Sequence, residues 1–449
     1  MLNPKELENL IDSGEFQLLK NGVTDVNPVD VADLIEGLPA AKAVLLFRVL
    51  PKDYAAAVFA NLYSETQESI VGLLSDNEIS NVVEKLFLDD AADFVDEMPA
   101  TIAKKILAHA TPETREQINT LLKYKKDSAG TKMTVEFVSL KRTLTVAQAF
   151  ERIRKVGTEK ETIYTCYVTN SERILEGVIT AKKLLLSDPE QLVGDIMDTN
   201  LVMAHTDEDR EAVARLFERY DFLTIPVVDS ESRLVGIITI DDIIDVVEEE
   251  ATEDFEKMAG MSPSDKPYLK TGIVKLARNR MAWLTALMLA SILTGAILEA
   301  YETALAEITM LMFFVPMLMD TGGNSGAQSS TMVIRGLALG DVLPRDFFRI
   351  IWKELRVGML AGTLLAAVNV VRILIQYGFD GDMLRITIVV SVTLLFTVVL
   401  ANVVGGVLPI AAKKVKVDPA LMAAPLITTI VDVSALLVYF AMAKMLLGV

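Results

Sequence analysis

Residues 313–328 read FFVPMLMDTGGNSGAQ, and this stretch decides the fold of the last third of the chain. Its first half is apolar and predicts a membrane helix, whereas its second half carries three glycines, two amides and hydroxyl groups. Backbone N–H and C=O groups inside hydrocarbon must find partners within the protein, so these glycines predict a break that lies against protein or along water. Such a break can aim carbonyl oxygens at a cation. The alternative is a kinked helix that packs through its small residues.

The composition predicts a membrane protein with a large acidic part. The chain has 449 residues, of which 51% are hydrophobic. Residues 1–270 hold 29 Lys/Arg and 50 Asp/Glu (net −21), and residues 271–449 hold 14 and 11 (net +3). Such an acidic part repels nucleic acid and anionic lipid and favours cations or basic partners. The single Cys166 excludes an intramolecular disulfide framework. The first residues lack the apolar core of a signal peptide, so residues 1–270 are expected in the cytoplasm.

Residues 1–126 predict an acidic helical domain. Short apolar-periodic segments alternate with Pro and with helix-capping residues. The segment DVADLIEGLP at residues 30–39 is echoed by DAADFVDEMP at residues 90–99, a spacing of 60. This echo predicts a stack of helical hairpins, that is, a small solenoid.

Residues 127–240 contain a second repeat, in which strands alternate with helices. The segment TCYVTNSE at residues 165–172 aligns, 59 residues on, with TIPVVDSE at residues 224–231, and each copy continues into a second strand. Helices are expected before the two copies at Val146–Val156 and Arg210–Tyr220. This repeat resembles a tandem pair of cystathionine-β-synthase (CBS) domains, a regulatory module that often binds adenine nucleotides. The resemblance makes ATP a candidate ligand of the pair.

Residues 241–270 begin with an acidic helix that contains no basic residue over residues 241–255. Like charges four residues apart on a helix destabilise it by a few tenths of a kcal/mol each, so a nearby cation or basic partner would favour this helix. The alternative is a solvated linker helix.

Residues 271–449 predict five membrane spans, since a span needs about 20 apolar residues. The expected spans are Met281–Leu298, a broken second span over residues 308–339, Val357–Ile375, Ile386–Ala412 and Leu421–Leu447. Basic residues such as Arg278, Arg345 and Lys413 gather in the connections on one side. The positive-inside rule therefore predicts a multi-pass protein of the cell inner (plasma) membrane, with its N-terminus cytoplasmic and its C-terminus outside.

Asp432 is the only charged residue between Leu421 and Ala443. An acid at that depth is a functional candidate by default, because an ionised carboxylate in a membrane is costly unless it is paired or hydrated. A permeating cation is the simplest partner, and a protonated Asp hydrogen-bonded to a neighbour is the alternative. The other available donors are amide, hydroxyl and carbonyl oxygens, which suit Mg²⁺, Ca²⁺ or Mn²⁺ rather than soft metals.

The ordered set of features, ending in GGNSGAQ at residues 322–328 and LITTIVDVS at residues 426–434, resembles the MgtE family of magnesium channels. The fold class implied is multi-domain: an α-helical N-terminal solenoid, α/β tandem CBS domains and an α-helical transmembrane domain of five spans. The resemblance also implies a homodimer in membrane lipid with the pore between the two membrane domains. Ala57 departs from the family pattern, because an acid is expected there.

The family's site residues can be carried over position by position. Asp432 matches the pore carboxylate and Asp418 an acid near the inner mouth. Beside these acids, the residues expected to line the pore are Pro316, Gly323, Asn324, Gln328 and Asn402, since the loop at residues 322–328 and Asn402 could supply neutral oxygens. The acids expected to sense Mg²⁺ in the cytoplasm are Asp89, Asp93, Asp209, Glu211, Asp221, Asp242, Asp245, Glu250, Glu253 and Asp254.

The function implied is uptake of Mg²⁺ through a channel that cytosolic Mg²⁺ closes by bridging the acidic surfaces. One alternative is a nucleotide-sensing protein whose CBS pair controls transport of another divalent cation, such as Mn²⁺ or Co²⁺. An enzyme is not expected, because no acid, base and nucleophile converge in the sequence.

Overall fold

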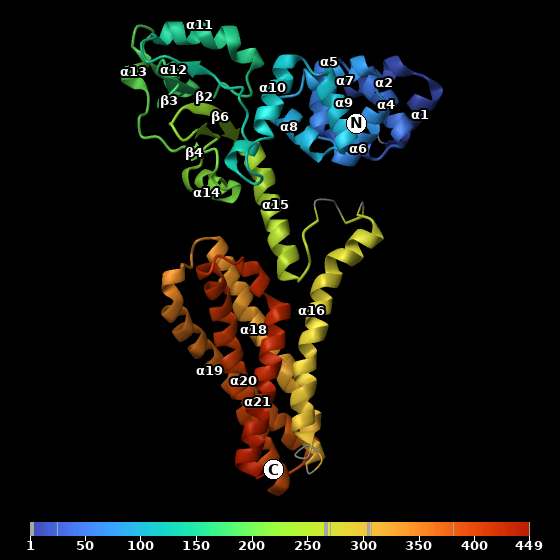
Figure 1. Ribbon diagram of the computed structural model, residues 1–449, viewed down its shortest axis with the longest axis vertical. Coiled ribbons are helices and arrows are strands. Elements are labelled where there is room, and N and C mark those ends of the chain that lie inside the picture. The colour runs from blue at the N-terminus through green and yellow to red at the C-terminus, as the bar shows by residue number, and fades with distance from the viewer. Residues whose placement is uncertain are drawn as a thin grey trace. The chain divides into compact units, whose positions relative to one another are not determined.

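The computed structural model describes residues 4–24, 26–264, 268, 269, 271–302, 306, 308–379 and 381–448 (Figure 1). It forms two compact units, Met1–Val247 and Glu248–Val449. The first unit contains a helical part and two small sheets, and the described part of the second is helical.

The helical part of the first unit is a repeat of short helices. After α1 (Pro4–Ser13) and α2 (Phe16–Val23) come α3 (Pro28–Glu36), α4 (Ala40–Val49), α5 (Lys52–Ala60), α6 (Ser64–Leu73), α7 (Asp76–Val83), α8 (Leu88–Glu97), α9 (Ala100–His109) and α10 (Pro112–Leu121). From α3 to α10 each helix begins 12 residues after the one before it. The spacing of 60 seen in the sequence is therefore five steps of this repeat. Alternate helices pack on one another, α3 on α5, α5 on α7 and α7 on α9, which confirms the predicted stack of hairpins.

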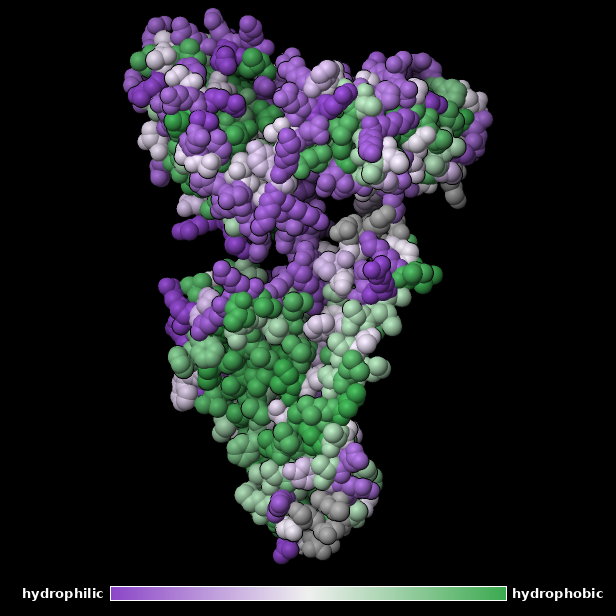
Figure 2. Space-filling view, in the orientation of Figure 1, coloured by the Kyte–Doolittle hydropathy of each residue, from purple (hydrophilic) through white to green (hydrophobic). Residues whose placement is uncertain are grey.

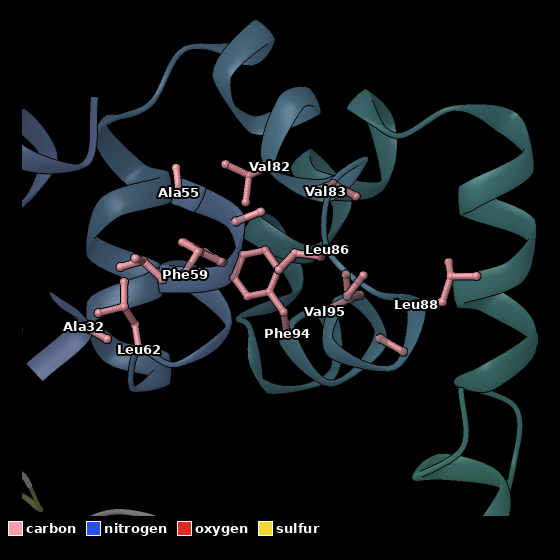
Figure 3. Packing of buried hydrophobic residues seen from close by; sticks show 14 of the residues in the cluster. Ala32, Ala55, Phe59, Leu62, Val82, Val83, Leu86, Leu88, Phe94 and Val95 are labelled. Carbon is pink, nitrogen blue, oxygen red and sulfur yellow. The ribbon is translucent and has the colours of Figure 1, made fainter. Parts of the chain in front are cut away.

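The apolar side chains of these helices share one core (Figure 3). Phe59 of α5 and Phe94 of α8 meet edge to face, with ring centroids 4.9 Å apart and planes at 88°. Ala32, Val83 and Leu86 are buried in the same cluster. Edge-to-face aromatic pairs stabilise a core beyond the area that they bury, so this contact ties distant hairpins together.

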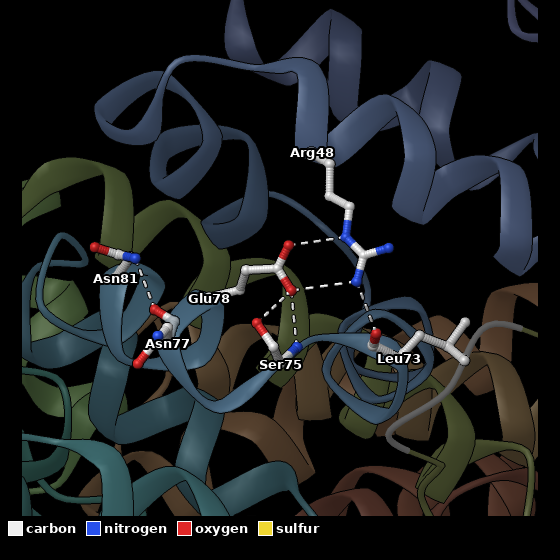
Figure 4. A network of polar contacts seen from close by, with 6 residues as sticks. All are labelled: Arg48, Leu73, Ser75, Asn77, Glu78 and Asn81. Carbon is white, nitrogen blue, oxygen red and sulfur yellow. Dashed lines mark hydrogen bonds and ion pairs between the residues drawn. The ribbon is translucent and has the colours of Figure 1, made fainter.

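An ion pair joins α4 to the start of α7 (Figure 4). Arg48 donates to both carboxylate oxygens of Glu78, at 2.8 and 3.2 Å, and to the carbonyl oxygen of Leu73 at 3.1 Å. The backbone N–H of Ser75 also donates to Glu78, which completes a capping box at the start of α7. These hydrogen bonds, chiefly the one from Arg48, lower the pKa of Glu78 to about 2.

The two sheets follow the CBS repeat. The first contains β1 (Ser139–Leu140), β2 (Thr165–Thr169) and β3 (Leu175–Thr180), and the second contains β4 (Ala204–His205), β5 (Thr224–Val228) and β6 (Leu234–Thr239). In each sheet the first pair of strands is parallel and the second antiparallel. The helices before the hairpins are α11 (Val146–Val156) and α14 (Arg210–Tyr220), with the predicted bounds, and α12 (Ala181–Leu186) and α13 (Val193–Ile196) lie between the copies.

The two repeats exchange short segments. Thr134, at the start of the first repeat, pairs with Ile237 in the sheet of the second, and Asp198 pairs with Val178 in the sheet of the first. A Cβ on Gly177 would lie 2.5 Å from the sulfur of Met197, and the segment after Met133 approaches Gly236 in the same way. The CBS pair is therefore one interlocked body.

The second unit is a bundle of long helices. They are the second half of α15 (Ile240–Met258), then α16 (Ile273–Ala300), α18 (Val315–Ala338), α19 (Phe347–Tyr377), α20 (Gly381–Lys414) and α21 (Ala424–Leu447). Hydrophobic residues gather on its surface (Figure 2), and four segments of the described residues are long and apolar enough to cross a membrane: Ile273–Ala300, Pro344–Tyr377, Met383–Lys414 and Pro419–Leu447.

The predicted break in the second span is wrong. α18 runs without interruption from Val315 to Ala338, preceded by a 3₁₀ segment at Thr309–Phe314. Its 24 residues have the length of a span, about 36 Å at 1.5 Å per residue. Its glycines, amides and hydroxyls keep it out of the four apolar segments, so α18 as the fifth span remains a prediction.

Candidate functional site

Three carboxylates from distant parts of the first unit meet at one point. Asp89 lies in the first turn of α8, Glu136 precedes β1, and Glu161 precedes β2. Each offers an oxygen, and these atoms all lie within 4.8 Å of one another. We call Asp89, Glu136 and Glu161 the acidic cluster. It joins the helical part to the first CBS repeat.

Few protein groups neutralise the acidic cluster. Glu136 accepts hydrogen bonds from the N–H of Leu88 at 3.2 Å and the hydroxyl of Thr134 at 3.3 Å, and Asp89 accepts one from the N–H of Asp90 at 3.0 Å. One carboxylate oxygen of Glu161 is buried and has no hydrogen-bond partner among the described residues. A buried acceptor without a donor is unfavourable, so this oxygen is available to a cation.

The acids in and around the cluster hold their protons unusually tightly. Burial, together with the neighbouring carboxylates, raises the pKa of Glu161 to about 8, and burial raises the pKa of Asp89 and Glu136 as well. Burial and the charge of Asp242 raise the pKa of Asp90 to about 7, and burial raises that of Asp242 to about 6. Keeping these carboxyl groups ionised together is therefore unfavourable unless a cation neutralises them.

The residues of the cluster fit a hard divalent cation. All the available atoms are carboxylate oxygens, which Mg²⁺ and Ca²⁺ prefer, and their mutual distances allow direct or water-mediated binding. Of the three, only Asp89 was predicted from the sequence. Glu136 and Glu161 were missed, since nothing in their local sequence distinguishes them from surface acids.

Asp93 and Asp242 lie close to the acidic cluster but have other partners. Asp93 is paired with Lys132 at 2.9 Å, and the hydroxyl of Thr239 donates to Asp242. The positive charge of Lys132 also acts on Asp242. The amino group of Lys132 thus neutralises part of the negative charge of Asp93 and Asp242, which a second cation would otherwise neutralise.

The predicted acids of the second CBS repeat lie at the two ends of α14. Asp209 caps the start of the helix by accepting the N–H of Glu211 at 2.9 Å, and Glu211 pairs with Arg215 at 2.6 Å. Asp221 ends the helix in the left-handed conformation, at φ 53°. A helix of 11 residues is about 16 Å long, so Asp209 and Asp221 cannot share one ion within a single chain.

The last turn of α15 reaches the start of the final membrane helix through a lysine. Lys257 is 2.7 Å from a carboxylate oxygen of Asp418 and also contacts Glu253 one turn earlier. Asp418 in turn accepts the N–H of Ala420 at 2.9 Å and caps the 3₁₀ turn before α21. Burial opposes the charge of Lys257, but the hydrogen bonds to Asp418 and Glu253 outweigh it and raise its pKa.

Two predicted metal ligands, Asp418 and Glu253, are therefore bridged by an amino group of the protein itself. The remaining predicted acids of this helix, Asp245, Glu250 and Asp254, are spread along α15. Asp245 is exposed, and Glu250 and Asp254 are half-buried.

The glycines of residues 322–326 bring helices together. A Cβ on Gly322 would lie 2.9 Å from Val431, one on Gly323 would lie 3.0 Å from Thr428, and one on Gly326 would lie 2.7 Å from Ile427, all in α21. Further along α18, the hydroxyl of Ser330 donates to the carbonyl oxygen of Met422 at 2.7 Å. α18 and α21 are thus antiparallel and closely packed, and the motif serves helix contact rather than a loop.

The predicted pore-lining residues fall into two groups. Pro316, Asn324 and Gln328 lie on one exposed face of α18, as their spacing of four and eight residues requires. Gly323 is buried against α21. Asn402 of α20 is also buried, and its amide donates to Ser325 at 2.9 Å and to Val398. These last two residues hold the bundle together and are not exposed on that face.

Asp432 lies in the middle of α21 and is half-buried. Among the described residues it forms no hydrogen bond or ion pair, and the charge that acts on it is that of Asp320 on α18. Within the described part of the chain, no base is paired with it.

Two cavities open on the CBS pair. One, of about 420 Å³, is lined by Lys141, Arg152 and Lys155 among others. The second, of about 360 Å³, lies between the polar turns of the two repeats and includes Arg173 and Arg233. The basic residues outnumber the one acid, Glu151, in the lining of the first cavity, which suits a phosphate-bearing ligand, whereas Glu172 and Asp229 balance the two arginines of the second.

Three family models match parts of the chain. A model of the MgtE intracellular N domain matches residues 26–127, a CBS-domain model matches residues 193–249, and the MgtE model, described as a divalent cation transporter, matches residues 315–442. The magnesium transporter MgtE of Thermus thermophilus is 37% identical over 445 residues, which cover 98% of each chain. The magnesium transporter MgtE of Bacillus subtilis is 33% identical over 438 residues, 97% of this chain and 95% of the relative.

Solved structures match the first unit. The cytosolic domain of the Mg²⁺ channel MgtE in complex with ATP is 34% identical, with a TM-score of 0.51, and covers 54% of this chain and 98% of that one. The soluble part of a magnesium transporter is 27% identical, with a TM-score of 0.53, and covers 55% and 98%. The relatives that span the whole chain are named as transporters, a class that does not include enzymes.

Proposed function

Because the chain belongs to the MgtE family of divalent cation transporters, we propose that it carries Mg²⁺ into the cell and that cytosolic Mg²⁺ closes it. The observation that carries this proposal is Asp432, an acid without a protein partner among the described residues, in the middle of an apolar helix. An ionisable residue in the middle of a membrane helix is a functional candidate by default, because its charge is costly there unless it is paired or hydrated.

The ion path is proposed to lie between two copies of the second unit. One carboxylate per chain, doubled across a two-fold axis, suits a hydrated Mg²⁺, which gives up its water reluctantly and is held through its waters by one or two acids. The exposed polar face of α18, with Asn324 and Gln328, supplies neutral oxygens for the same hydration shell. The N-terminus is proposed to be cytoplasmic and the C-terminus outside.

Closure is proposed to depend on metal binding at acids of the first unit. Without a cation, the crowded carboxylates of the acidic cluster oppose packing of the helical part on the CBS pair. A bound Mg²⁺ supplies two positive charges there. It shifts the equilibrium toward the packed state by the difference between its binding free energies for the packed and the separated states. Other predicted acids, at the ends of α14 and along α15, would need ligands from a second copy or from another domain to complete a site.

Flux measurements test the proposed function. Purified protein in liposomes is expected to carry Mg²⁺, and the Asp432→Asn variant should lose this flux while remaining monodisperse. Asp341→Asn, an exposed acid in the loop after α18, is the matched control. Equal Mg²⁺ flux in the Asp432 variant and the wild type would refute the pore assignment. Faster flux of Mn²⁺ or Co²⁺ than of Mg²⁺ would favour the other cation as the cargo.

ATP is proposed as a second ligand of the CBS pair. The support is the similar cytosolic domain described in complex with ATP, together with positive side chains around two cavities of this pair. Titration calorimetry of the full-length protein with ATP, repeated with Arg173→Ala and Lys141→Ala, tests binding and distinguishes the cavities. No heat of binding at millimolar ATP would remove ATP from the proposal.

A further inference from the structure

A second acid of the membrane unit, Asp320, lies in α18 beside the glycine motif. It is exposed, and it shares its helix face with Asn324 and Gln328, four and eight residues further on. In the part of the chain that the structure describes, it forms no hydrogen bond or ion pair. An acid on this face would be unfavourable against lipid, whereas a hydrated path or a polar face of a second copy would accommodate it.

The helix register brings Asp320 level with Asp432. Gly326 packs on Ile427 and Gly322 packs on Val431, so four steps back along α18 correspond to four steps forward along α21. Asp320, two residues before Gly322, is therefore level with Val433, which is one residue, or about 1.5 Å, from the height of Asp432. The electrostatic effect of Asp320 on Asp432 is consistent with this placement.

We propose that Asp320 is a second carboxylate of the ion path, and that Asp320 and Asp432 together set the preference for divalent over monovalent cations. This inference rests on the proposed transport of Mg²⁺. Two carboxylates at one height attract a divalent ion twice as strongly as a monovalent ion at the same distance. Because neither acid has a protein partner among the described residues, both remain available to the waters of a hydrated cation.

The test uses full-length protein in liposomes, with Asp320→Asn, Asp320→Glu and the control Asp341→Asn. Removing one unit charge several ångströms from a divalent ion in a water-like dielectric should raise the half-saturating Mg²⁺ concentration about fivefold. The same change should increase K⁺ permeability relative to Mg²⁺. Asp320→Glu, which keeps the charge, should stay within about twofold of wild type.

A labelling experiment remains informative if Asp320→Asn fails to fold. In an Asp320→Cys variant, a charged methanethiosulfonate reagent should react, and Mg²⁺ should slow the reaction; the native Cys166 is buried. The inference is overturned if Asp320→Asn matches Asp341→Asn in both flux measurements, or if Mg²⁺ does not protect the introduced cysteine. Absence of Mg²⁺ flux in the wild type would instead overturn the proposed function, and this inference with it.

Discussion

Replacing Glu161 by Gln tests whether the acidic cluster is a metal-dependent element. The pKa of Glu161 is raised to about 8, because its side chain is half-buried beside Asp241, Asp242 and other acids. Gln has nearly the same shape and carries no charge in either the folded or the unfolded state. We therefore expect the metal-free first unit to become more stable and to lose most of its response to Mg²⁺.

The magnitude follows from the difference between the two pKa values. A carboxyl group with a folded pKa raised from 4.5 to about 8 reduces the stability progressively as pH rises between these values, because the unfolded chain ionises first. At pH 7 the reduction is about 3 kcal/mol before solvent screening, and about 1 to 2 kcal/mol for a side chain that is partly exposed. For a unit of this size, that corresponds to a gain of roughly 2 to 8 °C in melting temperature.

The assay is thermal unfolding of the isolated first unit with and without Mg²⁺; similar soluble parts have been crystallised on their own. The wild type should gain stability on adding Mg²⁺, by about 1.4 kcal/mol at a concentration ten times the dissociation constant. Glu159→Gln, an exposed acid two residues away, is the control and should behave as the wild type. A lower melting temperature for metal-free Glu161→Gln, or an undiminished Mg²⁺ response, would refute the reasoning.

Three further predictions address proton competition, the end of α15 and helix packing. Acids near the cluster have pKa values raised to about 6, 7 and 8, so the metal-free melting temperature should fall from pH 5 to pH 8, and stabilisation by Mg²⁺ should grow over the same range. Lys257→Met should increase the flux that remains at saturating internal Mg²⁺ by roughly threefold, and Lys257→Arg should restore closure. Gly405→Ala places a Cβ 2.3 Å from the carbonyl oxygen of Gly326 and should lower the free energy of unfolding of the detergent-solubilised protein by about 1 to 3 kcal/mol. The control is Gly295→Ala, which has open space around the added Cβ and should not destabilise the protein.

The two internal repeats could be predicted from the sequence, because each copy supports the interpretation of the other. The 59-residue CBS echo predicted both flanking helices with their observed ends, Val146–Val156 and Arg210–Tyr220. The 60-residue echo in the helical part indicated stacking, although the true step of 12 residues is visible only once the helix starts are known. Capping residues or prolines recur at most of these helix starts, since each helix must satisfy its first N–H groups anew, although α6 and α8 begin after Tyr63 and Phe87 without a side-chain cap.

The glycine motif was misread because glycine serves two purposes. It permits unusual backbone conformations, and it lets helices approach closely. Sequence alone does not separate these, and the neighbouring Pro316 favoured a break. In the structure Pro316 lies in the first turn of α18, where its missing N–H has no effect on the helix. The kinked-helix alternative named the correct use of the small residues, namely packing, although this helix is continuous.

The acidic cluster could not be predicted for a different reason. Asp89, Glu136 and Glu161 are separated by up to 72 residues and meet only when the helical part packs on the first CBS repeat. Lys257 was missed similarly, because its partner Asp418 is 161 residues away. Both contacts follow from tertiary packing, which a local pattern of charges does not encode.

The two ends of α15 differ in what neutralises their acids. At its first turn, Asp242 adjoins a group of carboxylates, and burial raises its pKa to about 6, so we expect Mg²⁺ and pH to act at this end. At its last turn, Glu253 and Asp418 already share the amino group of Lys257, whose charge does not depend on metal. If the first end of α15 binds Mg²⁺ as we propose, the helix would respond there while its last turn keeps the Lys257 contacts. This arrangement predicts that mutations near Asp242 change the Mg²⁺ concentration for closure, whereas loss of Lys257 weakens closure at every concentration.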